Sequence, residues 1–470
     1  MTVTLETTQT ASTNPDDAFA RLAADLDGSL IRPGEADWDD ARAAWQLAVD
    51  QQPAAVVLAG SVHDVVRTVT TARESRLHVA PQSTGHNAGP LQLGPDTVLL
   101  KTSALRAVHI DPIRYVARAE AGALWMQVTD AAAEHGLTAL AGSSRDVGVA
   151  GYTLGGGLSW LARSHGLAAN SVTALEVVTA DGRHRRVDAT RDPDLFWALR
   201  GGGGSYAVVT ALEFRLYPLT GIHAGVLFWP IERASEVLQA WRAWLPTVPD
   251  TVTSVGRLLR FPPLPDLPPH LSGQSFVVVE AACQLDADDT AKLLAPLRAL
   301  GPAIDTFATI LTAELGRLHM DPDGPVPAHG DGMLLGELDE AGIEALIAVT
   351  GTGPSPLLSV ELRQLGGALA PGAMPGGAVS GIDASFAGFF VGMTPDAESA
   401  AAVRSAVTAV QHAMAPWSAH RCLLNFTERY ADGSTFFGGD VHERLRVVKA
   451  TYDPHEVIRA NHAVAPTPGK

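Results

Sequence analysis

The first 220 residues alternate short apolar runs with helical patterns. Residues 54–60 (AAVVLAG) form a continuous apolar run, which predicts a buried strand. Valines recur at helical spacing up to Val69, and Ser61 with Asp64 predicts a capping box at the start of this helix. Further strands are predicted at 77–80, near 97–101, near 114–119, at 171–179 and at 208–216, and further helices near 124–135, closed by Gly136, and after Asp192-Pro193.

The pattern changes after about Pro218. Proline-rich loops at 262–269 and 321–327 lie among helical stretches and strands such as 276–281 and 357–362. This texture predicts a second domain with its own antiparallel sheet, and the tail from about His420 returns to a strand-and-helix pattern. We therefore predict an α+β fold in which a first domain of residues 1–218 is completed by 419–470, with a second domain at 219–418.

Composition narrows the classes of partner. The chain has 470 residues, enough for two domains, and a formal net charge of -17, which would repel a nucleic-acid backbone. Its two cysteines, Cys283 and Cys422, give neither a disulfide framework nor zinc spacing, so no metal is expected. Residues 1–20 lack the basic start and apolar stretch of a secretory signal, and no apolar run is long enough for a bilayer. We expect a cytoplasmic protein without a membrane partner, and its oligomeric state stays open.

Three glycine-rich loops, 81–90, 142–157 and 200–206, stand out in the first domain. A diphosphate needs several backbone N–H groups with no Cβ in the way, and glycine allows both the close approach and positive φ angles. Each loop alone is as well explained by a tight turn. The spacing of Gly85 and Gly89 does not match the nicotinamide-binding fingerprint, and no loop ends in the Gly-Lys-Ser/Thr of a P-loop.

The loops occur in an order that points to one family. The motifs read PQSTGHN at 81–87, VGVAGYTLGGG at 147–157, RGGGGSYAVVT at 200–210, LLNF at 423–426, and LRVVK at 445–449 followed by YDP at 452–454. Together they resemble the berberine bridge enzyme-like FAD-linked oxidases of the vanillyl-alcohol oxidase superfamily. The resemblance implies a PCMH-type FAD-binding domain of two α/β subdomains, and a substrate domain whose antiparallel sheet is flanked by helices.

The resemblance also implies how FAD is held. In the family, a ring nitrogen of the loop histidine, here His86, bonds the flavin 8α-methyl carbon, and the loop N–H groups hold the pyrophosphate. The residues expected to contact the cofactor are His86, Gln82, Ser83, Thr84, Gly85, Asn87, Ser144, Val147, Gly148, Gly151, Tyr152, Gly155, Gly156, Val209 and Asn425.

One departure from the family concerns a second flavin tether. Many relatives use a cysteine in Cys-Pro-Thr-Val-Gly, where this chain has SRDVG at 144–148. Because Ser144 cannot form a thioether, we expect a single tether through His86. An electron-withdrawing tether is expected to keep the flavin potential high and so to favour hydride acceptance.

Two second-loop residues are expected beside the flavin ring. Val147 takes a position that resembles the family's oxygen gate near flavin C4a, where a valine leaves room for direct reoxidation by O2; the alternative is plain packing. Tyr152 takes a position near the flavin C2 carbonyl that relatives often fill with histidine. Its hydroxyl would donate to the charge that builds there as hydride arrives, and the alternative is a core aromatic.

The catalytic base is less well defined. The tyrosine that relatives often place two residues before the terminal asparagine is Leu423 here, and another relative's carboxylate position falls near 389–390. Strand alternation puts Glu361 and Arg363 on one face, which in relatives looks at the flavin. Glu361 is thus a candidate base or substrate anchor with Arg363 as its charge partner, and a structural salt bridge is the alternative. Tyr430 is a further candidate.

These features predict an FAD-dependent oxidase of a small or medium organic substrate, such as an alcohol, sugar, amine or natural-product intermediate. Hydride would pass to flavin N5, and O2 would reoxidise the flavin. A dehydrogenase, or a cyclising or dearomatising biosynthetic enzyme of the same fold, is the main alternative, and Leu423 favours it. A non-enzymatic binder and a nicotinamide-dependent reductase are further alternatives.

Overall fold

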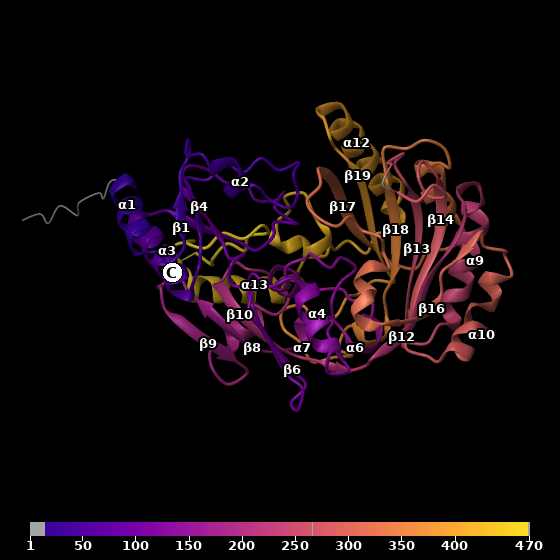
Figure 1. Ribbon diagram of the computed structural model, residues 1–470, viewed down its shortest axis with the longest axis horizontal. Helices are drawn as coiled ribbons and strands as arrows, with labels where there is room; N and C mark the ends of the chain where they lie inside the picture. The colour runs from indigo at the N-terminus through magenta and orange to yellow at the C-terminus, as the bar shows by residue number, and fades with distance from the viewer. Residues whose placement is uncertain (1–14, 266, 469–470) are drawn as a thin grey trace, which may run out of the picture.

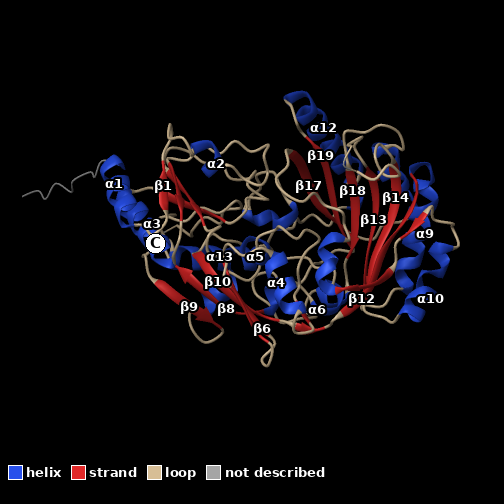
Figure 2. Cartoon of the chain, viewed as in Figure 1, coloured by secondary structure: helices blue, strands red, loops and turns tan. Residues whose placement is uncertain are grey.

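The computed structural model describes residues 15–265 and 267–468 (Figure 1). The molecule is elongated, with small sheets and short helices at one end and a large sheet covered by helices at the other (Figures 1 and 2). The chain passes once from the first end to the second, and its C-terminal segment returns to the first (Figure 1). The α+β class predicted from the sequence is confirmed.

The first sheet has the strand order β1-β2-β4-β3, in which β2, β4 and β3 are parallel and β1 is antiparallel. Helix α3 buries Val65 and Val69 against Val57 and Leu100 of this sheet. The elements are α1 (Pro15–Asp25), β1 (Ser29–Ile31), α2 (Trp38–Arg42), β2 (Ala55–Leu58), α3 (Val62–Ser75), β3 (His78–Gln82) and β4 (Thr97–Lys101).

The second sheet is antiparallel, with the order β5-β6-β10-β8-β9, and its core includes Trp125 and Phe214. Its strands are β5 (Val108–Asp111), β6 (Val116–Glu120), β8 (Val172–Val178), β9 (His184–Asp188) and β10 (Val208–Arg215), and a short pair joins β7 (Leu137–Thr138) to β11 (Tyr217–Pro218). The helices are α4 (Trp125–Ala133), α5 (Val149–Leu154), α6 (Ala162–His165), α7 (Ala168–Ser171) and α8 (Pro193–Ala198).

The large sheet is antiparallel throughout, in the order β15-β12-β14-β13-β18-β19-β17, with β16 also pairing with β12. Its strands are β12 (Gly221–Pro230), β13 (Val252–Arg260), β14 (Ser275–Cys283), β15 (Ile304–Asp305), β16 (Ala308–Leu311), β17 (Ala328–Leu335), β18 (Ser359–Gln364) and β19 (Phe386–Met393). The helices packed beside it are α9 (Ala234–Trp244), α10 (Ala287–Arg298), α11 (Glu340–Thr350) and α12 (Ala397–Ala413).

Strand alternation gives the two faces of the large sheet different chemistry. Val360 and Leu362 of β18 belong to the apolar core shared with the helices, whereas Glu361 and Arg363 lie on the opposite face. That face meets the small-sheet end of the molecule. A buried arginine of α6, Arg163, donates to the carbonyls of Val252 and Leu365 at 2.5 and 3.0 Å and so fastens the two ends together. The domain boundaries at 218/219 and 418/419 stay a prediction.

Several local predictions need correction. Ser61 caps α3 by accepting from Asp64 N, as expected, but Asp64 does not return a bond to Ser61. Its buried carboxylate accepts from the N–H groups of Gly60, Asp27 and Gly28 instead, and so satisfies three backbone donors of the adjoining loops. Strands β1 and β5 and helix α5 were not predicted from the sequence.

The C-terminal segment was predicted as strand and helix. It contains 3-10 turns and helix α13 (Gly439–Tyr452), and its strand-like part is a single bridge from Ile458 to Val79, so no strand forms there among the described residues. Within residues 15–265 and 267–468, every helix is too short or too polar to cross a lipid bilayer.

Candidate active site

The first glycine loop leaves β3 and presents His86. Gly85 has φ +85°, a left-handed conformation that glycine adopts without strain. His86 Nδ1 lies 2.8 Å from Thr84 Oγ1, and its ring stacks on Trp45 with centroids 4.0 Å apart and planes inclined by 16°. Trp45 is held in place because its backbone N–H donates to the carbonyl of Thr84 at 2.9 Å. The imidazole therefore has a fixed plane.

The second glycine loop reaches the same histidine through Asp146. Asp146 Oδ1 lies 3.4 Å from His86 Nε2, within ion-pair range but without the alignment of a hydrogen bond. Trp45 Nε1 donates to Asp146 Oδ2 at 2.5 Å, and Ser144 Oγ donates to Oδ1 at 3.0 Å. Burial opposes ionisation of Asp146, but its interactions with His86 and Trp45 lower its pKa to about 2.

Glycine is required where the loops touch. Gly148 begins α5, and a Cβ there would lie 2.7 Å from Ser83 Oγ of the first loop. A Cβ at Gly155 would lie 1.8 Å from Asn425 Oδ1, and Asn425 Nδ2 donates to the carbonyl of Tyr152 at 2.9 Å. Gly156 follows with φ +110°. The glycines of the second loop thus let the first loop and the C-terminal segment approach its backbone.

Asn87 joins the first loop to the C-terminal segment. Its Nδ2 donates to the carbonyls of Leu424 and Thr427 at 3.0 and 3.1 Å, and Asn461 Nδ2 donates to its carbonyl at 3.3 Å. The residues near the C-terminus that were singled out in the sequence therefore lie against the first loop, more than 300 positions away in the chain.

Tyr152 of the second loop is partly buried against the core of the second sheet. Its hydroxyl donates to the carbonyl of Leu140 at 3.1 Å, and its ring meets Trp125 edge-on at 5.3 Å between centroids. Burial raises the pKa of Tyr152, which keeps the hydroxyl a donor. To reach a flavin carbonyl, the hydroxyl would have to leave Leu140, so this role stays a prediction.

The other predicted cofactor residues occupy varied surroundings. Gln82 ends β3 and donates to Gln51 Oε1 at 2.8 Å, away from His86. Val147 is half-buried and packs on the core of the second sheet, while Val209 is buried within β10 in that core. A Cβ added to Gly151 would meet no neighbour, so α5 presents a bare, exposed face at this residue.

Buried polar atoms without partners gather where the loops meet. Within the described part of the chain, Ser83 Oγ, Asn87 Oδ1, Thr153 Oγ1 and Asn425 Oδ1 make no hydrogen bond, nor does His86 Nε2. Buried polar groups are normally hydrogen-bonded, so their shared location fits a polar ligand that would supply the missing partners. The residues present therefore fit FAD.

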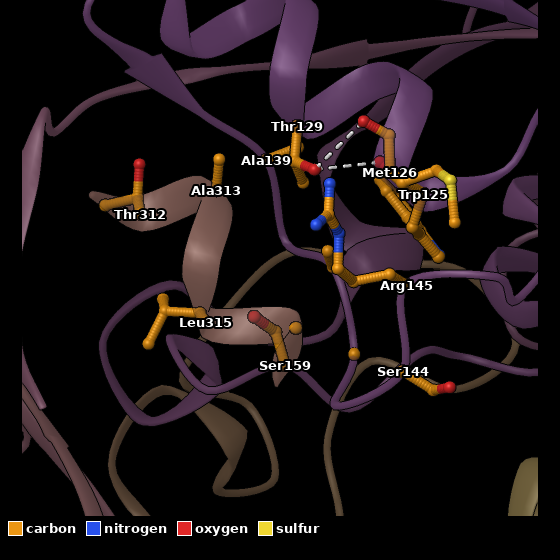
Figure 3. Close-up of a pocket in the computed structure, with 13 residues that line it drawn as sticks. Trp125, Met126, Thr129, Ala139, Ser144, Arg145, Ser159, Thr312, Ala313 and Leu315 are labelled. Atoms are coloured by element: carbon orange, nitrogen blue, oxygen red, sulfur yellow. Dashed lines mark hydrogen bonds between the residues drawn. The ribbon is translucent and has the colours of Figure 1, made fainter. Parts of the chain in front are cut away.

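Two cavities border these loops. Figure 3 shows a narrow crevice between α4 and the 3-10 helix η3 (Thr312–Arg317), lined by Ser144 and Arg145 of the second loop, with Ser144 pointing away from the centre. A larger cavity of about 490 Å³ lies beside the end of the first loop, where Gly89, Ser205 and Arg459 contribute to its wall. Both cavities touch a glycine loop.

The candidate base, Glu361, lies on the face of the large sheet that is opposite its helices. It belongs to a group of buried charged side chains that we call the charged cluster: Arg257, Glu280, His319, Glu361 and Arg363. His319 Nε2 lies 2.5 Å from Glu361 Oε2, and His319 Nδ1 lies 2.5 Å from Glu280 Oε2. Arg363 Nε donates to Glu361 Oε1 at 2.8 Å, and Arg257 Nη1 donates to Glu280 Oε1 at 3.2 Å. Both carboxylates are therefore paired.

Charge keeps the cluster ionised. Burial opposes ionisation of Glu361, yet the charges of Arg363 and His319 lower its pKa. Burial and Arg257 oppose the imidazolium form of His319, but Glu280 and Glu361 raise its pKa. A carboxylate held so strongly in its charged form is a poor proton acceptor and a good positioning group.

Arg363 connects the charged cluster to the glycine loops. Its Nη2 donates to Ser143 Oγ of the second loop at 3.2 Å, and its guanidinium lies 5.2 Å from the centre of the Phe426 ring, next to Asn425. The structure thus brings Glu361 and Arg363 to the second loop and the C-terminal segment. Tyr430 is 75% exposed, on the surface.

Comparison with known proteins matches this arrangement to one family. A family model described as an FAD binding domain matches residues 53–188, and one described as berberine and berberine like matches 424–465. The chain therefore contains an FAD-binding domain and a C-terminal segment similar to that of the berberine bridge enzyme-like proteins. The first family model contains the first and second glycine loops but not the third, and the second family model begins one residue before Asn425.

Full-length relatives of this FAD-linked oxidoreductase are distant. It is 27% identical over 459 residues to the uncharacterized FAD-linked oxidoreductase YgaK of Bacillus subtilis, covering 94% of this chain and 97% of the relative. It is 25% identical over 469 residues to (R)-6-hydroxynicotine oxidase of Paenarthrobacter nicotinovorans, with the same coverage. The solved structure of wild-type BBE-like 1 from Physcomitrella patens superposes with a TM-score of 0.83 at 20% identity, covering 96% of this chain and all of that one. The enzyme is therefore an FAD-dependent oxidoreductase with this family's fold.

Several residues of the oxidoreductase site were missed in the sequence. Glu280 is a lone carboxylate in an otherwise apolar strand, a signal that could have revealed a buried ion pair. Trp45 and His319 lie in segments without a motif. Asp146 was noted only within residues 144–148, where the sequence departs from the family's Cys-Pro-Thr-Val-Gly motif. Their roles depend on contacts between distant segments.

Proposed function

We propose that this protein is an FAD-dependent oxidase whose flavin is attached through His86 alone. It would oxidise a small or medium organic substrate by hydride transfer to flavin N5, with reoxidation by O2. The observation that carries the proposal is the fixed imidazole of His86, which lies beside unpaired buried polar atoms of two glycine loops. Such an imidazole is oriented for one bond to a bound group.

FAD supplies the hydride acceptor and the route of electrons to oxygen. The chain's contribution is positional: Ser83, Thr153 and Asn425 offer buried polar atoms to the cofactor. Tyr152 would serve as a donor near the ring if its hydroxyl turned from Leu140. These groups need no rearrangement of the backbone to act, because the glycine contacts already fix the loops.

Of the two roles open to Glu361, we favour positioning over proton abstraction. Both of its oxygens face cations, and it holds the Arg363 guanidinium beside Ser143 and Phe426. A guanidinium in that place can hydrogen-bond an oxygen of the substrate and fix its orientation toward the flavin. We therefore propose Arg363 as substrate anchor and Glu361 as its support.

A dehydrogenase, or a cyclising or dearomatising enzyme of the same fold, is the second candidate. It is favoured by Leu423, a side chain that cannot abstract a proton where relatives often have tyrosine. The oxidase is favoured by Val147, because a valine at the position expected beside flavin C4a fills less space than a leucine would. The rate at which air reoxidises the reduced enzyme separates the two, because a dehydrogenase reoxidises slowly.

The substrate is to be found by screening for peroxide release. The similarity to (R)-6-hydroxynicotine oxidase makes 6-hydroxynicotine a first compound to test, followed by alcohols, sugars and phenolics.

The His86 tether has a direct test. Acid precipitation of the purified protein should leave the yellow colour on the polypeptide, whereas His86→Ala should bind FAD that acid releases, and should turn over more slowly. His109→Ala, at an exposed histidine of β5, is the matched control and should keep its flavin. Free FAD released from the unaltered protein, or flavin retained by His86→Ala, would refute the assignment.

A further inference from the structure

Asp146 is a partly buried carboxylate with no role in the proposed function. It stands where the related Cys-Pro-Thr-Val-Gly motif has threonine, and its side chain is 15% exposed. Within residues 15–265 and 267–468, its ion-pair partner is His86 alone. We propose that Asp146 is the positioning residue for attachment of the flavin, orienting His86 and stabilising the positive charge that its ring gains; this rests on the proposed His86 tether.

Three donors hold the Asp146 carboxylate in place. Trp45 Nε1 donates to Oδ2 at 2.5 Å, Ser144 Oγ donates to Oδ1 at 3.0 Å, and the N–H of Gly324 donates to Oδ2 at 3.2 Å. These donors come from the N-terminal segment, the second glycine loop and a loop between η3 and β17. Because three segments hold the carboxylate, a shift of one of them leaves its distance to His86 unchanged.

Trp45 links the orientation of His86 to the carboxylate. The same indole that donates to Asp146 stacks on the imidazole, so one side chain sets both the ring plane and the direction of the carboxylate. Thr84 Oγ1 lies 2.8 Å from His86 Nδ1 on the other side of the ring. The imidazole is therefore restrained on its face and at both nitrogens.

The placement of Asp146 selects one tautomer of His86. A carboxylate near Nε2 favours the proton on that nitrogen, which leaves a lone pair on Nδ1 to accept from the Thr84 hydroxyl. Interactions with His86 and Trp45 lower the pKa of Asp146 to about 2 despite its burial, so the carboxylate is charged at neutral pH. The lone pair on Nδ1 can then form a bond once the Thr84 hydroxyl turns away from it.

Attachment of the flavin involves a balanced exchange of bonds. An imidazole N–H bond and one C–H bond of the flavin 8α-methyl group break, and one C–N bond forms. The two electrons released pass through the isoalloxazine to dioxygen, which leaves as hydrogen peroxide with both protons. Bond formation at Nδ1 leaves a positive charge on the ring until the Nε2 proton departs, and the Asp146 carboxylate is placed to stabilise that charge.

The test follows covalent flavin over time. Protein produced under riboflavin limitation is mixed with FAD in air, and the covalent fraction is measured by intact mass and by flavin fluorescence in denaturing gels. Asp146→Asn should bind FAD as tightly as the unaltered protein but attach it at least about tenfold more slowly, a barrier increase of about 1.4 kcal/mol. Asp146→Glu, which keeps a carboxylate, should recover most of the rate.

Matched variants make the outcome decisive. Asp130→Asn removes an exposed carboxylate that pairs with Arg145 of the same loop, and should attach flavin at the unaltered rate. An Asp146→Asn rate within about twofold of the unaltered protein would overturn the proposal. If Asp146→Asn fails to fold, Trp45→Phe decides, because it keeps an aromatic ring but loses the bond to Asp146: slower attachment supports the proposal and an unchanged rate overturns it. An unaltered protein that never attaches flavin would instead refute the proposed tether.

Discussion

At the scale of single residues, we expect the choice between oxidase and dehydrogenase to depend on the side chain at position 147. The carbonyl of Val147 accepts from Trp125 N at 3.0 Å, so the backbone position of this residue is fixed by α4. Its half-buried side chain packs on the core of the second sheet. A substitution at this position would therefore change the volume of the side chain without moving the backbone. Access of oxygen to the proposed flavin position should therefore follow the volume of residue 147.

We predict that Val147→Leu slows reoxidation of the reduced enzyme by O2. An added methylene group that raises the barrier by about 1.4 kcal/mol would make reoxidation roughly tenfold slower. Stopped-flow absorbance after anaerobic reduction measures the rate directly. Val147→Ala is the control and should reoxidise at least as fast as the unaltered protein. Equal rates for the leucine and alanine variants would show that residue 147 does not limit oxygen access.

At the scale of elements, helix α13 fastens the C-terminal segment to the third glycine loop. Lys449 Nζ is buried and donates to the carbonyls of Ser205 and Ile458 at 2.7 and 2.9 Å, and to Asp453 Oδ2 at 2.6 Å. Asp453 in turn accepts from the N–H groups of Val457 and Ile458 at 2.8 Å. The ion pair between Lys449 and Asp453 therefore stabilises the end of the helix and the turn that leads the chain back toward β3.

We predict that Lys449→Met lowers the free energy of unfolding by about 3–5 kcal/mol, because it leaves the Asp453 carboxylate buried without its cation. Differential scanning calorimetry measures the loss. Lys292→Met, at an exposed lysine of α10 that pairs with Asp289, should change stability by less than about 1 kcal/mol. A small effect at Lys449 would mean that water replaces the lost partner.

At the scale of the whole molecule, the charged cluster lies where the large sheet faces the glycine loops. Its members come from β13, β14, β18 and the segment after η3, and register places Arg257 directly opposite Glu361. Burying these charges is tolerated because each cation lies beside a carboxylate. The same pairing directs Arg363 toward Ser143, so the proposed substrate anchor is held by the contacts that neutralise the buried charges.

We predict that Glu361→Gln raises KM for the substrate found by the peroxide screen about tenfold or more, and lowers kcat less, because Arg363 loses the charge that orients it. Steady-state kinetics with calorimetry separates this from simple destabilisation. Glu314→Gln, at a half-exposed carboxylate of η3, is the control and should match the unaltered enzyme. A large fall in kcat that depends on pH would instead favour Glu361 as the base.

The sequence alone determined the features that depend on neighbours in the chain. Glycines at 85, 148, 155 and 156 mark positions where the backbone must turn or be approached closely, and strand alternation put Glu361 and Arg363 on one face. The motif order identified the family. These features could be predicted because period and φ preference are local properties, written into a few consecutive residues.

The tertiary structure alone decided which distant side chains meet. Nothing near Trp45 in the sequence indicates that it stacks on His86 and donates to Asp146, and nothing near His319 indicates that it lies between Glu280 and Glu361. Asp64 likewise bonds residues 27 and 28 rather than completing a local cap. Such partners are set by how the loops and sheets cross in space, because a buried charge or N–H must be satisfied by whatever group the fold brings within reach.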